Sequence, residues 1–87
     1  MRYRVLFQLS AARQVRKLTP DLQKRIVARA EALAADPRPP GCEELKGPTP
    51  FWRVRVGDYR IVYEIKDNVL LVLVVRVAHR REVYRDV

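Results

Sequence analysis

The feature that most restricts the fold of this chain is a tight turn in its last third. Two segments of alternating apolar and polar residues, 52–56 and 59–66, are joined by Gly57-Asp58. A two-residue turn with glycine in its first position is typical of a type II′ β-hairpin. Because such a turn fixes the strand register, we expect Arg55 to lie directly opposite Arg60.

Alternation places the side chains of this hairpin on two faces. The face expected to pack on the rest of the domain carries Trp52, Val54, Ile61 and Tyr63. The other face, which we expect to be open, carries Arg53, Arg55 and Arg60. A directly opposed pair of like charges costs about 0.2–1 kcal/mol. The Arg55–Arg60 pair is therefore either tolerated in water or used to hold an anion.

The first half of the chain predicts two helices. Ser10 is a candidate cap for a short helix that runs to about Leu18. Thr19-Pro20-Asp21 combines a capping residue, an N-terminal proline and an early acid, which is typical of a helix start. Asp36-Pro37 is expected to end this second helix, because proline disfavours helical geometry in the residue before it. Residues 37–50 hold five prolines and two glycines, which indicates an ordered loop rather than a strand or helix.

The remaining strands complete one α+β domain that spans residues 1–87. Residues 1–7 alternate as a half-buried strand, and the nearly apolar run 69–77 indicates a strand covered on both faces. Asp67-Asn68 is expected to form the turn before that run, and residues 82–84 are a candidate last strand. The predicted order is β-α-α-β-β-β(-β), with an antiparallel sheet and both N-terminal helices packed on one of its faces.

Composition limits the classes of function that the chain can have. The chain has 87 residues, a net charge of +8 and a pI near 10.4, which suggests a polyanionic partner, although a charged surface also serves solubility. One histidine and one cysteine, Cys42, give no zinc site and no internal disulfide, so we expect neither metal nor cofactor. No secretory signal or membrane segment is visible, and a cytoplasmic location is the simplest interpretation.

A second group of chemically active residues follows the apolar run: His79, Arg80, Arg81 and Tyr84. The predicted hairpins bring this segment near Arg60, where it would face a bound phosphate. Arginine pairs well with phosphate oxygens but is a poor base, whereas tyrosine beside cations and histidine can both move a proton. Each of these residues also has an ordinary alternative, as a solvated strand-end charge or a packed aromatic ring.

Three motifs carry a resemblance over nearly the whole chain. They are Glu44-Leu45-Lys46-Gly47, the hairpin Phe51–Ile65 with its GDYRIVYEI run, and the ending HRREVY at residues 79–84. With these motifs the chain resembles the RelE/ParE superfamily of bacterial toxins, on the RelE side. The resemblance implies an mRNA interferase, a ribosome-dependent endoribonuclease that cleaves the codon in the A site. It also implies a cognate RelB-like antitoxin, encoded in an adjacent reading frame.

The resemblance assigns roles to individual residues. Arg60 would stabilise the phosphate, Arg80 the leaving group, and Tyr84 would stack on or activate the nucleotide. Arg53 and Arg55 stand where well-studied members carry lysines, one of them a proposed general base. The implied catalytic residues are Arg60, Arg80, Tyr84, Arg55 and His79, and the implied RNA-binding residues are Arg53, Arg55, Lys46 and Arg81. Because arginine is a poor base, Tyr84 or His79 is expected to take the proton.

Two other functions fit the same features. A ParE-like toxin would share the fold but would bind DNA gyrase and would not be a nuclease. A non-toxic module would use the basic face to bind RNA or an acidic partner. For the leading interpretation the expected partners are the antitoxin, mRNA and the ribosome at the 30S A site, including its 16S rRNA.

Overall fold

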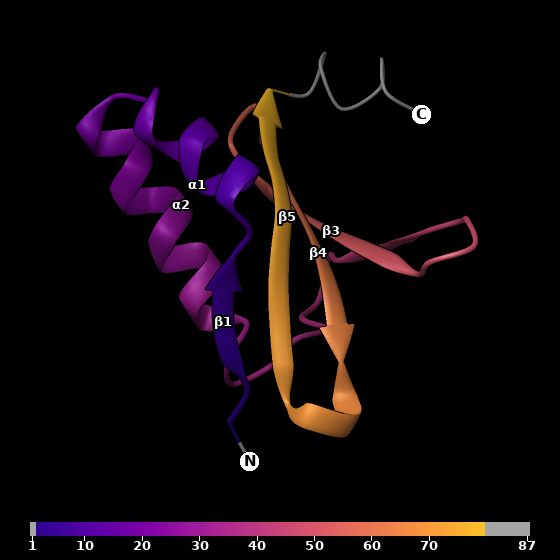
Figure 1. Cartoon of the computed structure of the whole chain (residues 1–87). Coiled ribbons are helices and arrows are strands. Elements are labelled where there is room, and N and C mark those ends of the chain that lie inside the picture. The colour runs from indigo at the N-terminus through magenta and orange to yellow at the C-terminus, as the bar shows by residue number, and fades with distance from the viewer. Residues whose placement is uncertain (1, 80–87) are drawn as a thin grey trace.

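The computed structural model describes residues 2–79 (Figure 1). The predicted strand at residues 82–84 lies outside this range. Along the chain the elements are β1 (Arg4–Phe7), α1 (Leu9–Arg16), α2 (Pro20–Ala32), β2 (Glu43–Leu45), β3 (Phe51–Val56), β4 (Tyr59–Lys66), the 3-10 turn η1 (Asp67–Val69) and β5 (Leu71–His79). Neither helix of this range is long and apolar enough to cross a membrane.

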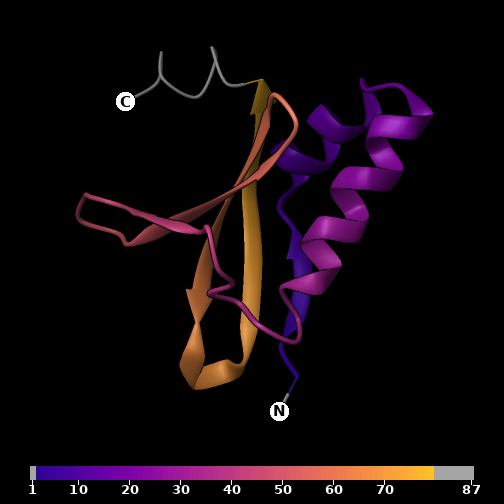
Figure 2. The same cartoon turned by 180° about the vertical axis from the view of Figure 1, so that it is seen from behind.

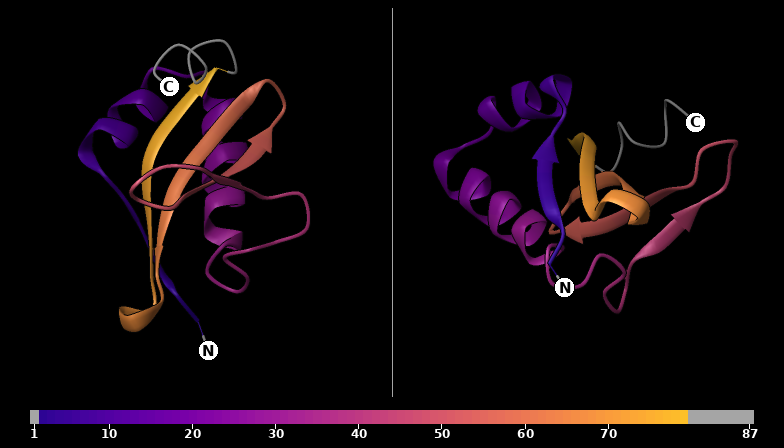
Figure 3. Two further views of the ribbon diagram at one scale, coloured as in Figure 1. Left: turned by 90° about the vertical axis from the view of Figure 1, so that its right-hand side faces the viewer. Right: turned by 60° about the horizontal axis from the view of Figure 1, so that its bottom comes forward.

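One five-stranded sheet is covered by the two helices on a single face. The strand order is β1-β5-β4-β3-β2. Both helices lie on the same side of the sheet, and the opposite side carries no helix of the described residues (Figures 2 and 3). The predicted α+β class and the placement of both helices on one face are confirmed. The prediction of an antiparallel sheet is wrong for one pair of strands: β1 runs parallel to β5, while the other neighbouring strands are antiparallel, so the sheet is mixed.

The β3–β4 hairpin has the predicted register. Val56 pairs with Tyr59 and Arg55 with Arg60. Gly57 has a φ of 57°, and Asp58 is not among the residues with positive φ. This combination is the type II′ geometry that glycine adopts without strain in the first turn position.

The second turn and the last strand differ from the prediction by two residues. Asp67-Asn68 opens the 3-10 turn η1, and Leu70 then adopts a left-handed φ of 52°. The apolar run therefore enters the sheet only at Leu71 and leaves it at His79. A turn of this length consumes two apolar residues, which alternation alone does not reveal.

The helix boundaries are partly as predicted. Thr19 caps α2 by accepting a 3.4 Å hydrogen bond from the Leu22 amide, as expected. Ser10 is not a cap, because α1 begins at Leu9 after Gln8. The regular part of α2 ends at Ala32 rather than at Asp36. Tighter bonds to the third residue back, such as Leu33 N to Ala30 O at 3.0 Å, replace the helical pattern there.

The proline-rich connection contains a strand that was not predicted. β2 pairs antiparallel with β3 over Phe51–Arg53. The five prolines of residues 37–50 flank Glu43–Leu45 but do not interrupt it. An edge strand also needs ladder bonds on one side only, so three residues suffice.

The core lies between the sheet and the helices. Its fully buried side chains of largest volume are Tyr63, Ile26, Leu33, Ile61, Val54, Val72 and Val74. The Tyr63 hydroxyl donates a 2.7 Å hydrogen bond to the buried Pro37 carbonyl. Burial raises the pKa of the Tyr63 phenol, so the group remains a donor. This bond fastens the start of the proline-rich connection to the middle of the sheet.

Replacing Tyr63 with phenylalanine should destabilise the domain by about 1–2 kcal/mol, because the buried Pro37 carbonyl loses its donor. Urea unfolding followed by tryptophan fluorescence measures the change. Tyr59→Phe is the matched control, since the Tyr59 hydroxyl has no hydrogen bond among the described residues. Equal unfolding midpoints for the two variants would contradict a stabilising role for this bond.

A polar cluster joins segments that are distant in the sequence, next to the C-terminal end of β4. Asp67 accepts hydrogen bonds from the Tyr3 hydroxyl at 2.5 Å and from both terminal nitrogens of Arg38 at 2.8 and 3.3 Å. The Arg38 guanidinium also lies 5.1 Å from the Trp52 ring centre, within cation–π range. The Arg38 hydrogen bond is the main reason that the pKa of Asp67 is lowered, and the Tyr3 bond adds to it.

This cluster gives the fold an acid-sensitive component. A lowered carboxyl pKa stabilises the folded state above the unfolded pKa, near 3.9, and this stabilisation is lost as the pH falls through the folded value. Melting temperatures between neutral pH and pH 3 should therefore fall more steeply for the wild type than for Asp67→Asn. If the melting temperatures of the two proteins fall equally over this pH range, the cluster contributes nothing to acid sensitivity.

Candidate functional site

Four arginines lie on the side of the sheet that faces away from the helices. β3 contributes Arg53 and Arg55, β4 contributes Arg60, and β5 contributes Arg76. Arg55 pairs with Arg60 across β3 and β4, and Val62 pairs with Arg53 on one side and Arg76 on the other. We call this set the arginine face. No helix of residues 2–79 covers this side of the sheet (Figure 2).

The arginine face is less open than alternation suggests. Arg55 is exposed, as expected, but Arg53 and Arg60 retain only 8% and 5% of their accessible surface. The expectation of three open arginines is therefore wrong for two of them. Long arginine stems lie along a sheet surface and bury their carbon atoms, which strand alternation cannot show.

Arg60 is the arginine whose surroundings favour an anion most. Its terminal nitrogen Nη1 donates to the Tyr59 carbonyl at 3.2 Å. Its Nε–H is buried and has no hydrogen-bond acceptor among the described residues, and no carboxylate there lies within salt-bridge distance of it. A buried donor on a permanently charged group is costly when it is left unsatisfied. Arg60 thus carries a positive charge that no described carboxylate neutralises, which favours an anion near this position.

Glu43 forms ion pairs with the two arginines of β3. Its carboxylate accepts a 2.5 Å bond from Arg53 Nη2, and its other oxygen lies 4.0 Å from Arg55 Nη2. The sequence did not reveal this pairing, because Glu43 lies in the strand that was not predicted. Arg53 and Arg55 are therefore partly neutralised, whereas Arg60 is not paired with Glu43.

A β-bulge brings Arg76 to the arginine face. Val62 pairs with Arg76 while Tyr63 pairs with Val74, so Val75 is the extra residue. Without the bulge, alternation from Val74 would direct Arg76 toward the helices. Arg76 was not among the predicted site residues, although a single charge inside the apolar run 69–77 is a signal that could have found it.

The same bulge places His79 on the helix side of the sheet. His79 is the last residue of β5 and pairs with Tyr59, and the two rings meet edge to face at 5.5 Å. It lines a cavity of about 250 Å³ between α1 and the sheet, together with Gln14 and Lys17. The strand continues two residues past the end of the predicted run 69–77. The His79 ring therefore lies across the sheet from Arg60.

The other predicted site residues lie beyond the strands that carry the arginine face. Arg80, Arg81 and Tyr84 lie outside the described residues. The pairing of Ala78 with Arg60 confirms the prediction that the end of the last long strand returns beside Arg60. Lys46 is exposed in the connection between β2 and β3, which extends away from the body of the domain (Figures 1 and 2).

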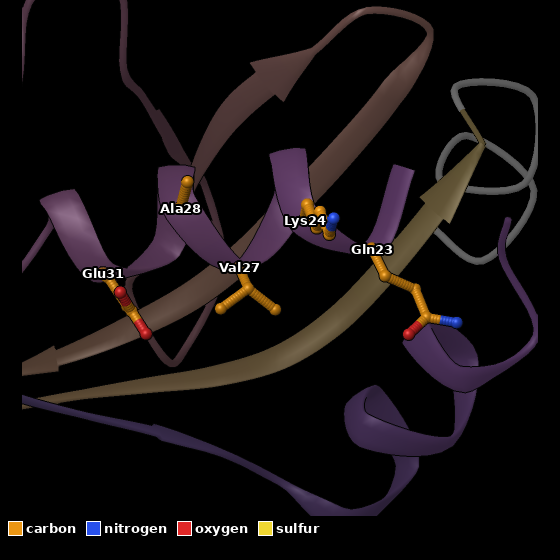
Figure 4. Close-up of a pocket in the computed structure, with 5 residues that line it drawn as sticks. All are labelled: Gln23, Lys24, Val27, Ala28 and Glu31. Atoms are coloured by element: carbon orange, nitrogen blue, oxygen red, sulfur yellow. The ribbon is translucent and has the colours of Figure 1, made fainter. Parts of the chain in front are cut away.

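A hollow of about 360 Å³ on the outer surface of α2 offers no comparable chemistry. Its lining residues all come from this one helix: Gln23, Lys24, Val27, Ala28 and Glu31 (Figure 4). The Gln23 amide already donates to the backbone carbonyls of Arg16 and Leu18. Within residues 2–79 no group of three or more histidine, cysteine or acidic side chains is placed to hold a metal ion.

Comparisons with known proteins agree with this fold. Residues 3–84 match the family model described as the ParE toxin of the type II toxin–antitoxin system parDE. Toxin RelG of Mycobacterium tuberculosis is 33% identical over 86 residues, which cover 98% of this chain and 99% of the relative. The chain therefore belongs to the RelE/ParE superfamily of toxins of type II toxin–antitoxin systems.

Solved structures show the same architecture. The toxin–antitoxin complex RelBE2 of Mycobacterium tuberculosis contains a chain with a TM-score of 0.81 and 30% identity, covering 92% of this chain and 100% of that one. The archaeal RelE–RelB complex of Pyrococcus horikoshii gives a TM-score of 0.81 at 22% identity, with coverage of 92% and 97%. The second likeness supports the fold alone.

Proposed function

We propose that this toxin is a ribosome-dependent endoribonuclease that cleaves mRNA in the A site and so stops translation. The 2′-hydroxyl of one nucleotide attacks the adjacent phosphorus, the bond to the 5′ oxygen of the next nucleotide breaks, and a 2′,3′-cyclic phosphate and a 5′-hydroxyl remain. The observation that carries the proposal is the buried Arg60 guanidinium, whose Nε–H lacks an acceptor among the described residues.

The arginine face supplies the electrostatic part of this reaction. Arg60 would bind the non-bridging oxygens of the scissile phosphate and stabilise the additional negative charge of the phosphorane. Arg55 and Arg76, its neighbours on the same face, would add positive charge. A preorganised cation is most effective where water is excluded, and the burial of Arg60 supports this role.

Proton transfer is assigned to the C-terminal segment. Following the resemblance, we propose that Tyr84 as phenolate accepts the 2′ proton, and that Arg80 stabilises the departing 5′ oxygen, which takes its proton from water. Tyr84 is preferred over His79 because the His79 ring packs against Tyr59 on the helix side of the sheet. Cations such as Arg80 and Arg81, which are close to Tyr84 in the sequence, would favour its phenolate and so make it a better base.

The proposal is tested by adding purified toxin to a reconstituted translation reaction and mapping mRNA 5′ ends by primer extension. Cuts within codons positioned in the ribosomal A site, absent from the same mRNA without ribosomes, are expected. Inhibited translation with intact mRNA would refute the proposed reaction.

A second candidate function is inhibition of DNA gyrase, because the matching family model is named after the ParE toxin. A supercoiling assay with purified gyrase separates the two candidates. The nuclease proposal expects gyrase to remain fully active at toxin concentrations that cleave mRNA. Loss of supercoiling together with intact mRNA would select the ParE-like function instead.

We also propose a RelB-like antitoxin as the physiological partner, encoded beside the toxin. Support comes from the structural relatives, which include RelBE2 and the archaeal RelE–RelB complex. An extended acidic segment would complement the net charge of +8. Co-expression with the neighbouring reading frame should yield a stable complex and relieve growth arrest; a toxin that remains free and active under these conditions contradicts the assignment.

A further inference from the structure

A wide groove runs between α2 and the turn that joins β3 to β4. Its volume is about 550 Å³, and its lining combines three arginines with a small apolar floor: Arg25, Ala28, Arg29, Ala32, Arg55, Val56 and Gly57. We propose that this α2–turn groove binds backbone phosphates of the same RNA strand that is held at Arg60. The inference rests on the proposed function and extends it from one phosphate to a path for the substrate.

Arg55 connects the groove to the arginine face. β2 pairs only with Phe51–Arg53, so residues 54–56 of β3 form an open edge of the sheet. At this edge Arg55 pairs with Arg60 in the ladder and also lines the groove on the α2 side. A strand of RNA bound at Arg60 can therefore pass over Arg55 without leaving positively charged surface.

Arg25 and Arg29 stand four residues apart on α2, which places them on one face of the helix. A Cβ atom added to Gly57 would lie 3.6 Å from Arg25 Nη2, so this guanidinium rests against the turn. Among residues 2–79, no carboxylate comes within salt-bridge distance of Arg25 or Arg29. Both side chains are thus available for phosphates, which bind arginine through charge-assisted hydrogen bonds.

The lining favours a nucleic acid over an acidic peptide. Ala28, Ala32 and Val56 form a floor of small side chains, without the deep apolar pocket that usually anchors a large aromatic or aliphatic residue of a protein partner. The positive charges instead form a continuous row, which runs from Arg60 through Arg55 to the arginines of α2. Single-stranded nucleic acids bind such positively charged grooves along their backbone.

Salt-dependent binding of a short, fluorescein-labelled 2′-O-methyl RNA strand tests the inference, because this probe has no free 2′-hydroxyl and cannot be cleaved by the proposed reaction. Removing two phosphate contacts in Arg25→Gln/Arg29→Gln should reduce the slope of log K against log salt by about 1.4, which corresponds to a roughly 25-fold loss of affinity at ~0.1 M relative to 1 M salt. Arg25→Lys/Arg29→Lys should retain most of the slope.

Matched controls separate the possible results. Arg13→Gln/Arg16→Gln removes two exposed charges from α1, outside the groove, and should change the slope much less. If the groove variant binds the probe with an unchanged slope while wild-type toxin still cleaves mRNA, the inference is wrong and the proposed function stands. The inference is also wrong if the groove variant loses only antitoxin binding. Wild-type toxin that neither binds the probe nor cleaves mRNA refutes both.

Discussion

Replacing Arg60 with glutamine is expected to slow mRNA cleavage about 100- to 1,000-fold, the usual effect of removing one donor from a site that stabilises transition-state charge. Glutamine keeps polar atoms at this buried position but carries no charge. The Nε–H of Arg60, which has no acceptor among the described residues, would no longer be available for the phosphate. The first-order rate of cleavage on saturated ribosome complexes measures the effect.

Two further variants make this result specific. Arg60→Lys keeps the charge but loses the planar fork, so it should recover part of the rate. Arg16→Gln removes an exposed charge at the end of α1 and should cleave like the wild type. A melting curve for Arg60→Gln confirms that the variant is folded at the assay temperature. Wild-type rates for a folded Arg60→Gln would remove Arg60 from the mechanism.

Ile26→Ala is expected to destabilise the domain by about 2–5 kcal/mol, because a large-to-small change in a packed core loses transfer free energy and leaves a cavity. Ile26 lies on the inner face of α2 and is fully buried in the core cluster. For a chain of this size the total stability is only about 4–13 kcal/mol, so this one change removes a large part of it. Urea unfolding gives the free energy directly.

The neighbouring residue provides the control for this prediction. Val27 is only half-buried and lines the hollow on α2 (Figure 4), so a smaller side chain there loses fewer packing contacts than at the fully buried Ile26. Val27→Ala should therefore cost less than Ile26→Ala, about 0.5–1.5 kcal/mol, which is usual when a small part of an aliphatic side chain is removed. If both variants unfold at the same urea concentration, α2 does not pack on the sheet through Ile26.

The hairpin at the centre of the site could be predicted from the sequence because its determinants are local. Gly57-Asp58 fixes the turn, the turn fixes the register, and the register places Arg55 opposite Arg60. The family could likewise be predicted from the motifs around this hairpin, and the match over residues 3–84 confirms it.

The features that the sequence did not reveal depend on contacts between distant segments. The bulge at Val75 is an adjustment between β4 and β5, and it moves Arg76 to one face and His79 to the other. Glu43 joins the arginine face only because a short edge strand pairs with β3. The burial of Arg60 likewise depends on how a long side chain lies on the sheet.

The central claim, that RNA is cleaved by attack of its own 2′-hydroxyl on a phosphate held at Arg60, is tested most directly by one substitution in the substrate. An mRNA with a single 2′-deoxynucleotide on the 5′ side of the cleaved bond in the A-site codon is translated with purified toxin, and its ends are mapped. We expect the cut at this bond to disappear in the substituted mRNA and to persist in the all-ribose mRNA. Equal cleavage of both mRNAs would contradict it.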